Sequence, residues 1–253
     1  MELRDGGREI GMRRKGIKRF FEVLVGEFRG LIKLNLLLCA CVLPSVAIFL
    51  LGLFGVYSVV ALVVSLLAAF PVGGAMSAFL FCVTRMLRDE PGYIWEDFKR
   101  KFAENKRQAA APGILCAAFM YAQVYLWGPV LFGGAEINSI WLIPGIGLLL
   151  IFCMVTPYFF LQVAYIDLGT KKIIVNSVLI SFSNAPRSFL GAITGGGIWI
   201  AFVLLLPESL VVAPVLLLFG FSVSLLLNMM WVWPPVNKLF KIEETLIERR
   251  ELS

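Results

Sequence analysis

The sequence contains no histidine, and it contains no charged residue between Leu34 and Thr84. Without histidine, neither a Ser-His-Asp or Cys-His nucleophile arrangement nor a histidine metal site can form. The long uncharged segment argues against a soluble domain, because about 20 apolar residues already cross the hydrocarbon core of a bilayer. The chain is accordingly 59% hydrophobic, with a mean hydropathy of +0.86.

Patterns for catalysis and cofactor binding are also missing. The sequence has no Gly-Lys-Thr or Gly-Lys-Ser phosphate loop, and its cysteines form no Cys-x-x-Cys pair. We therefore predict a non-enzymatic protein without catalytic residues, metal or cofactor. The five cysteines are interpreted as small packing residues inside apolar segments: Cys39, Cys41, Cys82, Cys116 and Cys153.

The cations are confined to a few parts of the chain. All 23 Lys and Arg residues occur in four stretches, residues 1–33, 85–107, 171–187 and 238–250. With six membrane crossings these stretches lie on one side, and the connections on the other side carry only Glu136 and Glu208. This is the positive-inside pattern, which predicts that both termini are cytoplasmic. The net charge of +6 then suits a bilayer with anionic headgroups, and we expect no nucleic-acid partner.

Apolar runs between the basic stretches predict an all-α polytopic integral membrane protein, with about six transmembrane helices in one membrane domain over residues 1–253. Pro71 is expected to kink the second span. Gly191 and Gly195 have the spacing that allows two helix backbones to approach closely. The predicted spans are residues 31–53, 56–85, 112–131, 140–166, 189–206 and 210–233.

Four segments at the cytoplasmic side are expected outside the hydrocarbon core. Residues 17–32 have apolar side chains at helical spacing and predict an amphipathic helix, either in the membrane interface or packed on the bundle. Segments 85–111, 169–188 and 234–253 complete this set. The candidate interfacial anchors are Phe20, Phe21, Trp95, Phe98 and Phe102.

A few polar side chains fall inside the predicted spans. Amides there usually form hydrogen bonds between helices, so a structural role is favoured for Asn35, Gln123, Gln162 and Asn228. The alternative is a pocket for a neutral solute, lined by Gln123, Gln162, Tyr121, Tyr125 and Trp127.

Asp167 is the acid at the cytoplasmic end of the fourth span. An ion pair with Lys171 or Lys172 is favoured for it over a role in binding a substrate or an ion.

Short motifs along the chain resemble those of the YesL-like family of bacterial integral membrane proteins, over most of residues 17–240. The sequence departs from that family by an apolar insertion between Pro44 and Pro71, which leaves the boundary between the first two spans open. The motifs are Lys33-Leu-Asn35 with Pro44, Pro71-Val-Gly-Gly-Ala, Thr84-Arg85, Arg88-Asp-Glu90, Asp97-Phe98 with Phe102, Glu104-Asn105 with Gln108, Pro157-Tyr158, Asp167, Asn176 and Asn184-Ala-Pro186-Arg187.

The resemblance implies a location in the bacterial plasma membrane and a connection with carbohydrate use. The family has no established activity and supplies no catalytic residues. We expect an accessory component of carbohydrate uptake or utilisation, with a sugar-permease complex as the candidate partner. The alternatives are a self-sufficient transporter or channel for a small neutral solute and, less favoured, a membrane-embedded enzyme built around Asp167.

Overall fold

The computed structural model describes residues 16–53, 55, 58–133, 139–205 and 212–251, and the regular structure of these residues is entirely α-helical. The helices are α1 (Ile17–Gly26), α2 (Phe28–Leu53), α3 (Ser58–Ala68), α4 (Phe70–Leu87), α5 (Ile94–Gly133), α6 (Ser139–Tyr165), α7 (Thr170–Ser183), α8 (Ala185–Leu205), α9 (Val212–Phe240) and α10 (Ile242–Glu251).

Five described helical segments are long and apolar enough to cross a membrane, so the fold is that of an all-α polytopic membrane protein. They are Phe28–Leu53, Ser58–Leu87, Ile94–Gly128, Pro144–Tyr165 and Leu218–Phe240. The fifth predicted span, residues 189–206, falls on α8, which is not among these five segments. A sixth crossing therefore stays a prediction.

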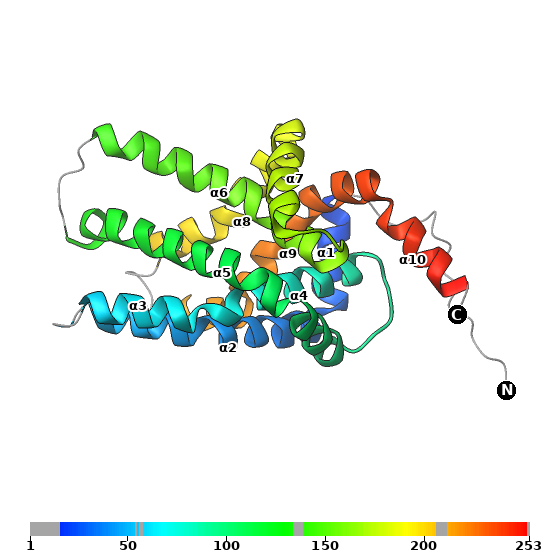
Figure 1. The fold of residues 1–253 in the computed structure, drawn as a ribbon, viewed down its shortest axis with the longest axis horizontal. Helices are drawn as coiled ribbons and strands as arrows, with labels where there is room; N and C mark the ends of the chain where they lie inside the picture. The colour runs from blue at the N-terminus through cyan, green and yellow to red at the C-terminus, as the bar shows by residue number, and fades with distance from the viewer. Residues whose placement is uncertain (1–15, 54, 56–57, 134–138, 206–211, 252–253) are drawn as a thin grey trace.

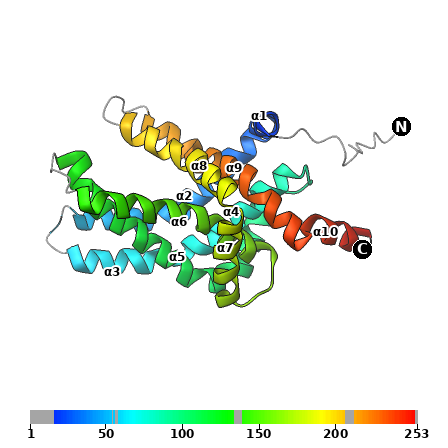
Figure 2. The ribbon, with the colours of Figure 1, turned by 90° about the horizontal axis from the view of Figure 1, so that it is seen from above.

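The long helices run roughly along one axis, with α3 toward one end of the bundle and α1 and α10 toward the other (Figure 1). Helices α1 and α10 and the connection between α4 and α5 lie at this end, on the right of Figure 1. We call it the charged end, because these elements come from the basic stretches of the sequence. Helix α7 lies across the bundle axis, and α8 and α9 run side by side away from α3 and α5 (Figure 2).

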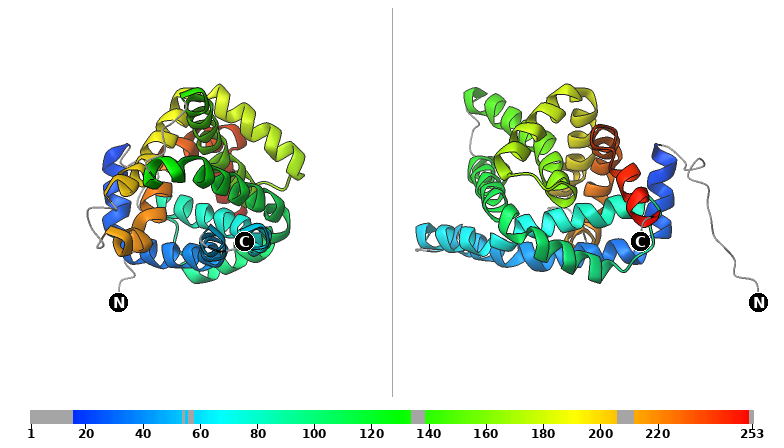
Figure 3. Two further views of the ribbon diagram at one scale, coloured as in Figure 1. Left: turned by 90° about the vertical axis from the view of Figure 1, so that its left-hand side faces the viewer. Right: turned by 45° about the vertical axis from the view of Figure 1, so that its right-hand side comes forward.

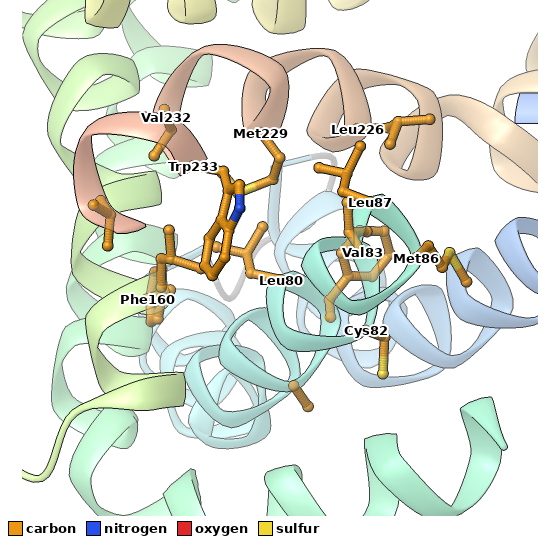
Figure 4. Close-up of a cluster of buried hydrophobic side chains, with 14 of the residues drawn as sticks. Leu80, Cys82, Val83, Met86, Leu87, Phe160, Leu226, Met229, Val232 and Trp233 are labelled. Carbon is orange, nitrogen blue, oxygen red and sulfur yellow. The ribbon is translucent and has the colours of Figure 1, made fainter. Parts of the chain in front are cut away.

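Helix α4 is the central helix of the bundle. It packs against α2, α5, α6 and α9, which group around it (Figure 3). Its side chains form the main core together with those of α6 and α9, and Trp233 of α9 points toward α4 (Figure 4). Phe79, Leu80, Tyr158 and Leu226 are completely buried in this core.

The second predicted span, residues 56–85, consists of two helices with different surroundings. The helix is interrupted at Ala69, between α3 and α4, and Pro71 lies in the first turn of α4. This position agrees with the predicted kink. Helix α3 exposes most of its valines and leucines, as a lipid-facing helix does, whereas α4 is buried by protein from Gly73 onward.

A neighbouring helix brings charged side chains close to the first turns of α4. Gly74 packs against the backbone of Lys106 on α5, and the side chains of Lys106 and Arg107 are exposed. A Lys or Arg side chain can extend from the hydrocarbon core to the headgroup layer only over its own length. The backbone of an exposed cation is therefore expected close to the headgroup layer. These exposed cations favour a membrane boundary near Gly74, but the apolar helical segment runs on to Leu87, so the predicted end of the second span at residue 85 stays a prediction.

Three helix boundaries differ from the predictions. The predicted helix over 17–32 is interrupted at Glu27, where the backbone leaves helical geometry between α1 and α2. The predicted surface segment 85–111 and the span 112–131 share one continuous helix, α5, because Gln108 to Ala111 favour helix and carry it through Pro112. Helix α9 continues through Pro234 and Pro235, and it ends at Phe240 before Lys241, which has a φ of 49°.

Glycines permit the closest helix contacts. A Cβ atom on Gly73 of α4 would overlap the carbonyl group of Ala109, and one on Gly113 of α5 would overlap Gly73. A Cβ atom on Gly195 of α8 would lie 3.0 Å from the carbonyl oxygen of Ser224 on α9, so the small-residue spacing predicted for Gly191 and Gly195 does mark a helix contact.

Candidate functional site at the charged end

Three arginine side chains are buried where α4 ends. Arg19 of α1, Arg85 in the last turn of α4 and Arg88 just after it each expose only 2–6% of their surface. A buried guanidinium is costly unless carboxylates and hydrogen-bond acceptors surround it. We call these arginines, together with Asp89, Glu90 and Asp97, the arginine junction.

Arg88 has the most complete set of partners. Its Nε and Nη2 donate to the two carboxylate oxygens of Glu90, both at 2.9 Å, and its Nη1 donates to the hydroxyl of Tyr165 at 2.8 Å. The guanidinium also lies 4.9 Å from the ring centroid of Trp233, a cation–π distance. Burial by itself lowers the pKa of Arg88, but the hydrogen bond and charge of Glu90 outweigh it and raise the pKa above its usual value.

These contacts join four helices at one point. The Tyr165 hydroxyl lies 2.6 Å from Oγ1 of Thr84 on α4, so α6 is tied to α4 beside Arg88. Trp233 on α9 donates from its indole nitrogen to Glu243 of α10 at 3.2 Å. Arg88 therefore fixes the ends of α4, α6, α9 and α10 relative to one another.

Arg19 closes the end of α4 from the side of α1. Its Nη2 donates to the carbonyl oxygens of Met86 and Leu87 at 3.1 and 2.9 Å and lies 2.8 Å from a carboxylate oxygen of Asp89. The last carbonyls of a helix lack partners within the helix and carry partial negative charge, which a cation complements. Asp89 follows in a left-handed conformation with a φ of 55°, which terminates the helix.

Arg85 and Asp97 form an ion pair between α4 and α5, and Asp97 also accepts from Arg100 at 2.6 Å. Gly92 lies directly against this pair, because a Cβ atom there would overlap the Arg85 guanidinium. The Nε of Arg85 is buried and finds no hydrogen-bond acceptor within the described residues.

A cavity of about 360 Å³ opens beside this pair. Its charged lining consists of Arg85, Arg88, Arg100, Glu90, Glu96 and Asp97, and its apolar walls come from Phe81, Tyr93 and Leu246. The volume lies in the lower part of the range typical of small-molecule sites. Within the described residues, no group of three His, Cys, Asp or Glu side chains is arranged to hold a metal ion.

The predicted polar residues of the spans lie away from this cavity. Asn35 of α2 accepts a hydrogen bond from the backbone amide of Ser222 on α9 at 2.9 Å, which is a contact between helices. Asn228 is buried beside Gly191 and Gly195 of α8. Both positions fit the structural role that the sequence favoured.

The proposed solute-pocket residues fall into separate groups. Gln162 donates to Oγ of Ser177 on α7 at 2.9 Å, whereas Gln123 accepts from Trp127 on its own helix at 2.8 Å. The rings of Tyr121 and Tyr125 pack against Phe49 of α2, with Tyr121 stacked at 4.0 Å and Tyr125 edge-on at 5.5 Å. These contacts do not bring the five side chains into one group.

Asp167 does not form the ion pair predicted for it. Its side chain is exposed, and no Lys or Arg of the described chain lies within ion-pair distance. The pairing with Lys171 or Lys172 assumed a continuous helix. Asp167 instead lies in the non-helical segment between Tyr165 and Thr170, where residues four apart do not face one another.

The candidate interfacial anchors divide into two sets. Phe20 and Phe98 are buried in the core, where they serve as packing residues, and Phe102 is half-buried against it. Phe21 and Trp95 are exposed. Helix α1 thus packs on the bundle with part of its apolar face and leaves Phe21 on the outside.

Comparisons of the chain with protein-family models, with curated proteins and with solved structures found no match.

Proposed function

We propose that this chain is a non-enzymatic accessory component of carbohydrate uptake or utilisation in the bacterial plasma membrane. In this proposal the charged end faces the cytoplasm and binds a subunit of a sugar permease. The carbohydrate part rests on the resemblance to the YesL-like family, and the docking part rests on the geometry of the charged end.

The observation that carries the docking proposal is a pair of exposed aromatic side chains, Tyr93 at the end of a rigidly held connection and Trp95 in the first turn of α5. Tyr93 and Trp95 expose 76% and 61% of their surface. The connection between α4 and α5 is fixed on both sides, by the pairs of Arg88 with Glu90 and of Arg85 with Asp97. Exposed Tyr and Trp on an ordered surface are typical of the residues that dominate protein–protein binding energies.

The position of Trp95 along α5 supports a protein partner over lipid. Trp95 lies about 18 Å along the helix from Arg107, at 1.5 Å per residue. The headgroup layer is only about 5–8 Å thick on each side of the hydrocarbon core. With Arg107 near the membrane boundary, Trp95 is in the aqueous phase, where an exposed indole gains most from contact with another protein.

The proposal is tested by co-purification from native membranes. An affinity-tagged copy is extracted in mild detergent during growth on complex carbohydrate, and its partners are quantified by mass spectrometry. We expect enrichment of sugar-permease subunits, and a decrease of at least about tenfold for Trp95→Ala. Phe182→Ala is the matched control, because Phe182 of α7 is also an exposed aromatic residue. A preparation without permease subunits, or an equal loss in both variants, would contradict the proposal.

The alternative, a self-sufficient transporter for a neutral solute, has less support. It needs Gln123 and Gln162 to face a common path, but each amide is hydrogen-bonded to a different neighbour. Solute flux into vesicles that contain the purified protein alone, abolished by Gln162→Leu, would favour this alternative instead.

A further inference from the structure

We propose that the cavity beside the connection between α4 and α5 binds a small molecule through one anionic group, a carboxylate or a phosphate, which Arg85 and Arg100 hold. This site shares Tyr93 with the docking surface proposed above, but it depends on Arg85 and Arg100 and not on Trp95, so either proposal can fail without the other.

The charged side chains around the cavity, three arginines and three carboxylates, sum to zero, but they are unevenly distributed. Glu90 forms a two-point contact with Arg88, and these two charges neutralise each other. Asp97, in contrast, is shared by Arg85 and Arg100, so that two cations face one anion. Glu96 stands exposed at the rim. An anionic group between Arg85 and Arg100 would give these two cations a second acceptor beside Asp97.

Arg85 also has unused hydrogen-bonding capacity. Its side chain is 94% buried and lines the cavity, yet its Nε has no acceptor within the described residues. A buried donor without a partner costs about 1–3 kcal/mol, and more when it is charged. Carboxylate and phosphate oxygens suit the planar donor array of arginine particularly well.

Two backbone features influence an anion at the same place. Helix α5 begins at Ile94, and the partial positive charge of this end adds to the field of Arg85 and Arg100, although Glu96 and Asp97 in the first turn already complement part of it. Gly92 has no side chain to shield Arg85, whereas any Cβ atom there would overlap the guanidinium. The Gly92 backbone covers one side of the guanidinium, so the anion has to approach Arg85 from the cavity.

The ligand is expected to be small and to come from the aqueous phase. The cavity of about 360 Å³ suits a metabolite-sized molecule, and Phe81, Tyr93 and Leu246 offer apolar walls for the rest of it. Arg85 lies about 16 Å along α4 from Gly74, at 1.5 Å per residue, which is beyond the headgroup layer. A phospholipid headgroup would offer the same phosphate chemistry, so the experiment has to separate the two sources.

The test measures the thermal stability of the purified full-length protein as inorganic phosphate or acetate is titrated at constant ionic strength, with chloride as the reference anion. A ligand that binds the folded state raises the melting temperature in a saturable manner. We expect such a rise with at least one of the two anions. For Arg100→Ala we expect a dissociation constant at least about tenfold weaker, as for the loss of one charged hydrogen bond.

Lys99→Ala is the matched control, because Lys99 is the exposed neighbour of Arg100 and does not line the cavity. Arg100 is largely exposed, so its removal leaves the fold intact. No saturable rise with either anion, or an equal loss in the two variants, would overturn the proposal.

Nanodiscs distinguish the two sources of the anion. If a bilayer with phosphatidylglycerol, but not one of pure phosphatidylcholine, suppresses the effect of added phosphate, the occupant is a lipid headgroup. If both bilayers leave the effect unchanged, the occupant is a soluble molecule. Both outcomes support an anion site at Arg85 and Arg100.

Discussion

At the scale of single residues, the sequence predicted local roles better than distant partners. The structural role of Asn35 followed from one amide in an apolar helix, and the contact of Gly195 followed from its spacing to Gly191. The partners of Arg88 did not follow, because Tyr165 and Trp233 are far away in sequence. The sequence did contain an indication of this charged cluster. Arg85 ends a long uncharged run and is followed within five residues by Arg88, Asp89 and Glu90. So many charges next to a buried helix require partners in the fold.

Replacement of Arg88 is expected to be among the most destabilising changes in the chain. Arg88→Ala removes the donors of two hydrogen bonds to the largely buried carboxylate of Glu90 and of one to the hydroxyl of Tyr165. Loss of one partner from a buried ion pair costs about 3–5 kcal/mol. We expect a decrease of that size in the free energy of unfolding, measured by chemical denaturation in detergent.

Two further variants serve as controls for this prediction. Arg88→Lys retains the charge but loses the two-point contact, and it is expected to fall between wild type and Arg88→Ala. Lys241→Ala removes an exposed ion pair with Glu244 and should change the stability by less than about 1 kcal/mol. Equal effects of Arg88→Ala and Lys241→Ala would contradict the role assigned to the arginine junction.

At the scale of elements, hydropathy located the apolar helices but did not show what surrounds them. Helices α3 and α4 are both apolar, yet α3 faces outward and α4 is enclosed by protein. The difference depends on α5, because its charged N-terminal half packs beside α4. The hydropathy of a sequence does not show which helices pack against each other. For the same reason, the continuity of α5 across the expected membrane boundary was not predicted.

The close crossing of α4 and α5 can be tested with two glycines on the same helix. Gly113→Ala places a methyl group into the backbone of Gly73, and overpacking of this kind costs about 1–3 kcal/mol. Gly128→Ala meets no atom within 4 Å, so its higher helix propensity should make it neutral or stabilising by up to about 1 kcal/mol. Unfolding curves of both variants in detergent would show whether the effects differ in this direction.

At the scale of the whole molecule, charge distribution and architecture support each other. Helices α1 and α10 and the α4–α5 connection, which come from three of the four basic stretches, lie at one end of the bundle (Figure 1). The sequence could predict this gathering because each cluster of cations marks one side of a bilayer. It could not predict that the ends of α4 and α5 build a cavity there.

The orientation is tested by labelling single introduced cysteines in sealed cells and in inverted vesicles. Lys99→Cys and Lys241→Cys are at exposed positions of the charged end, and we expect both to react only from the cytoplasmic side. Gly55→Cys, in the connection between α2 and α3, should react only from the opposite side. The parent protein, with its five natural cysteines, provides the background. Labelling of Gly55→Cys and Lys99→Cys from the same side would contradict the topology.

The most direct measurement is site-specific photocrosslinking in living cells, with a photoreactive amino acid placed at Trp95. Because this side chain is exposed in the first turn of α5 at the charged end, the account predicts one discrete protein adduct, identified by mass spectrometry as a sugar-permease subunit. The same probe at Phe182 of α7 should not give that adduct. Adducts with lipid alone at Trp95, or the same set of products at both positions, would contradict a partner-binding surface at the charged end.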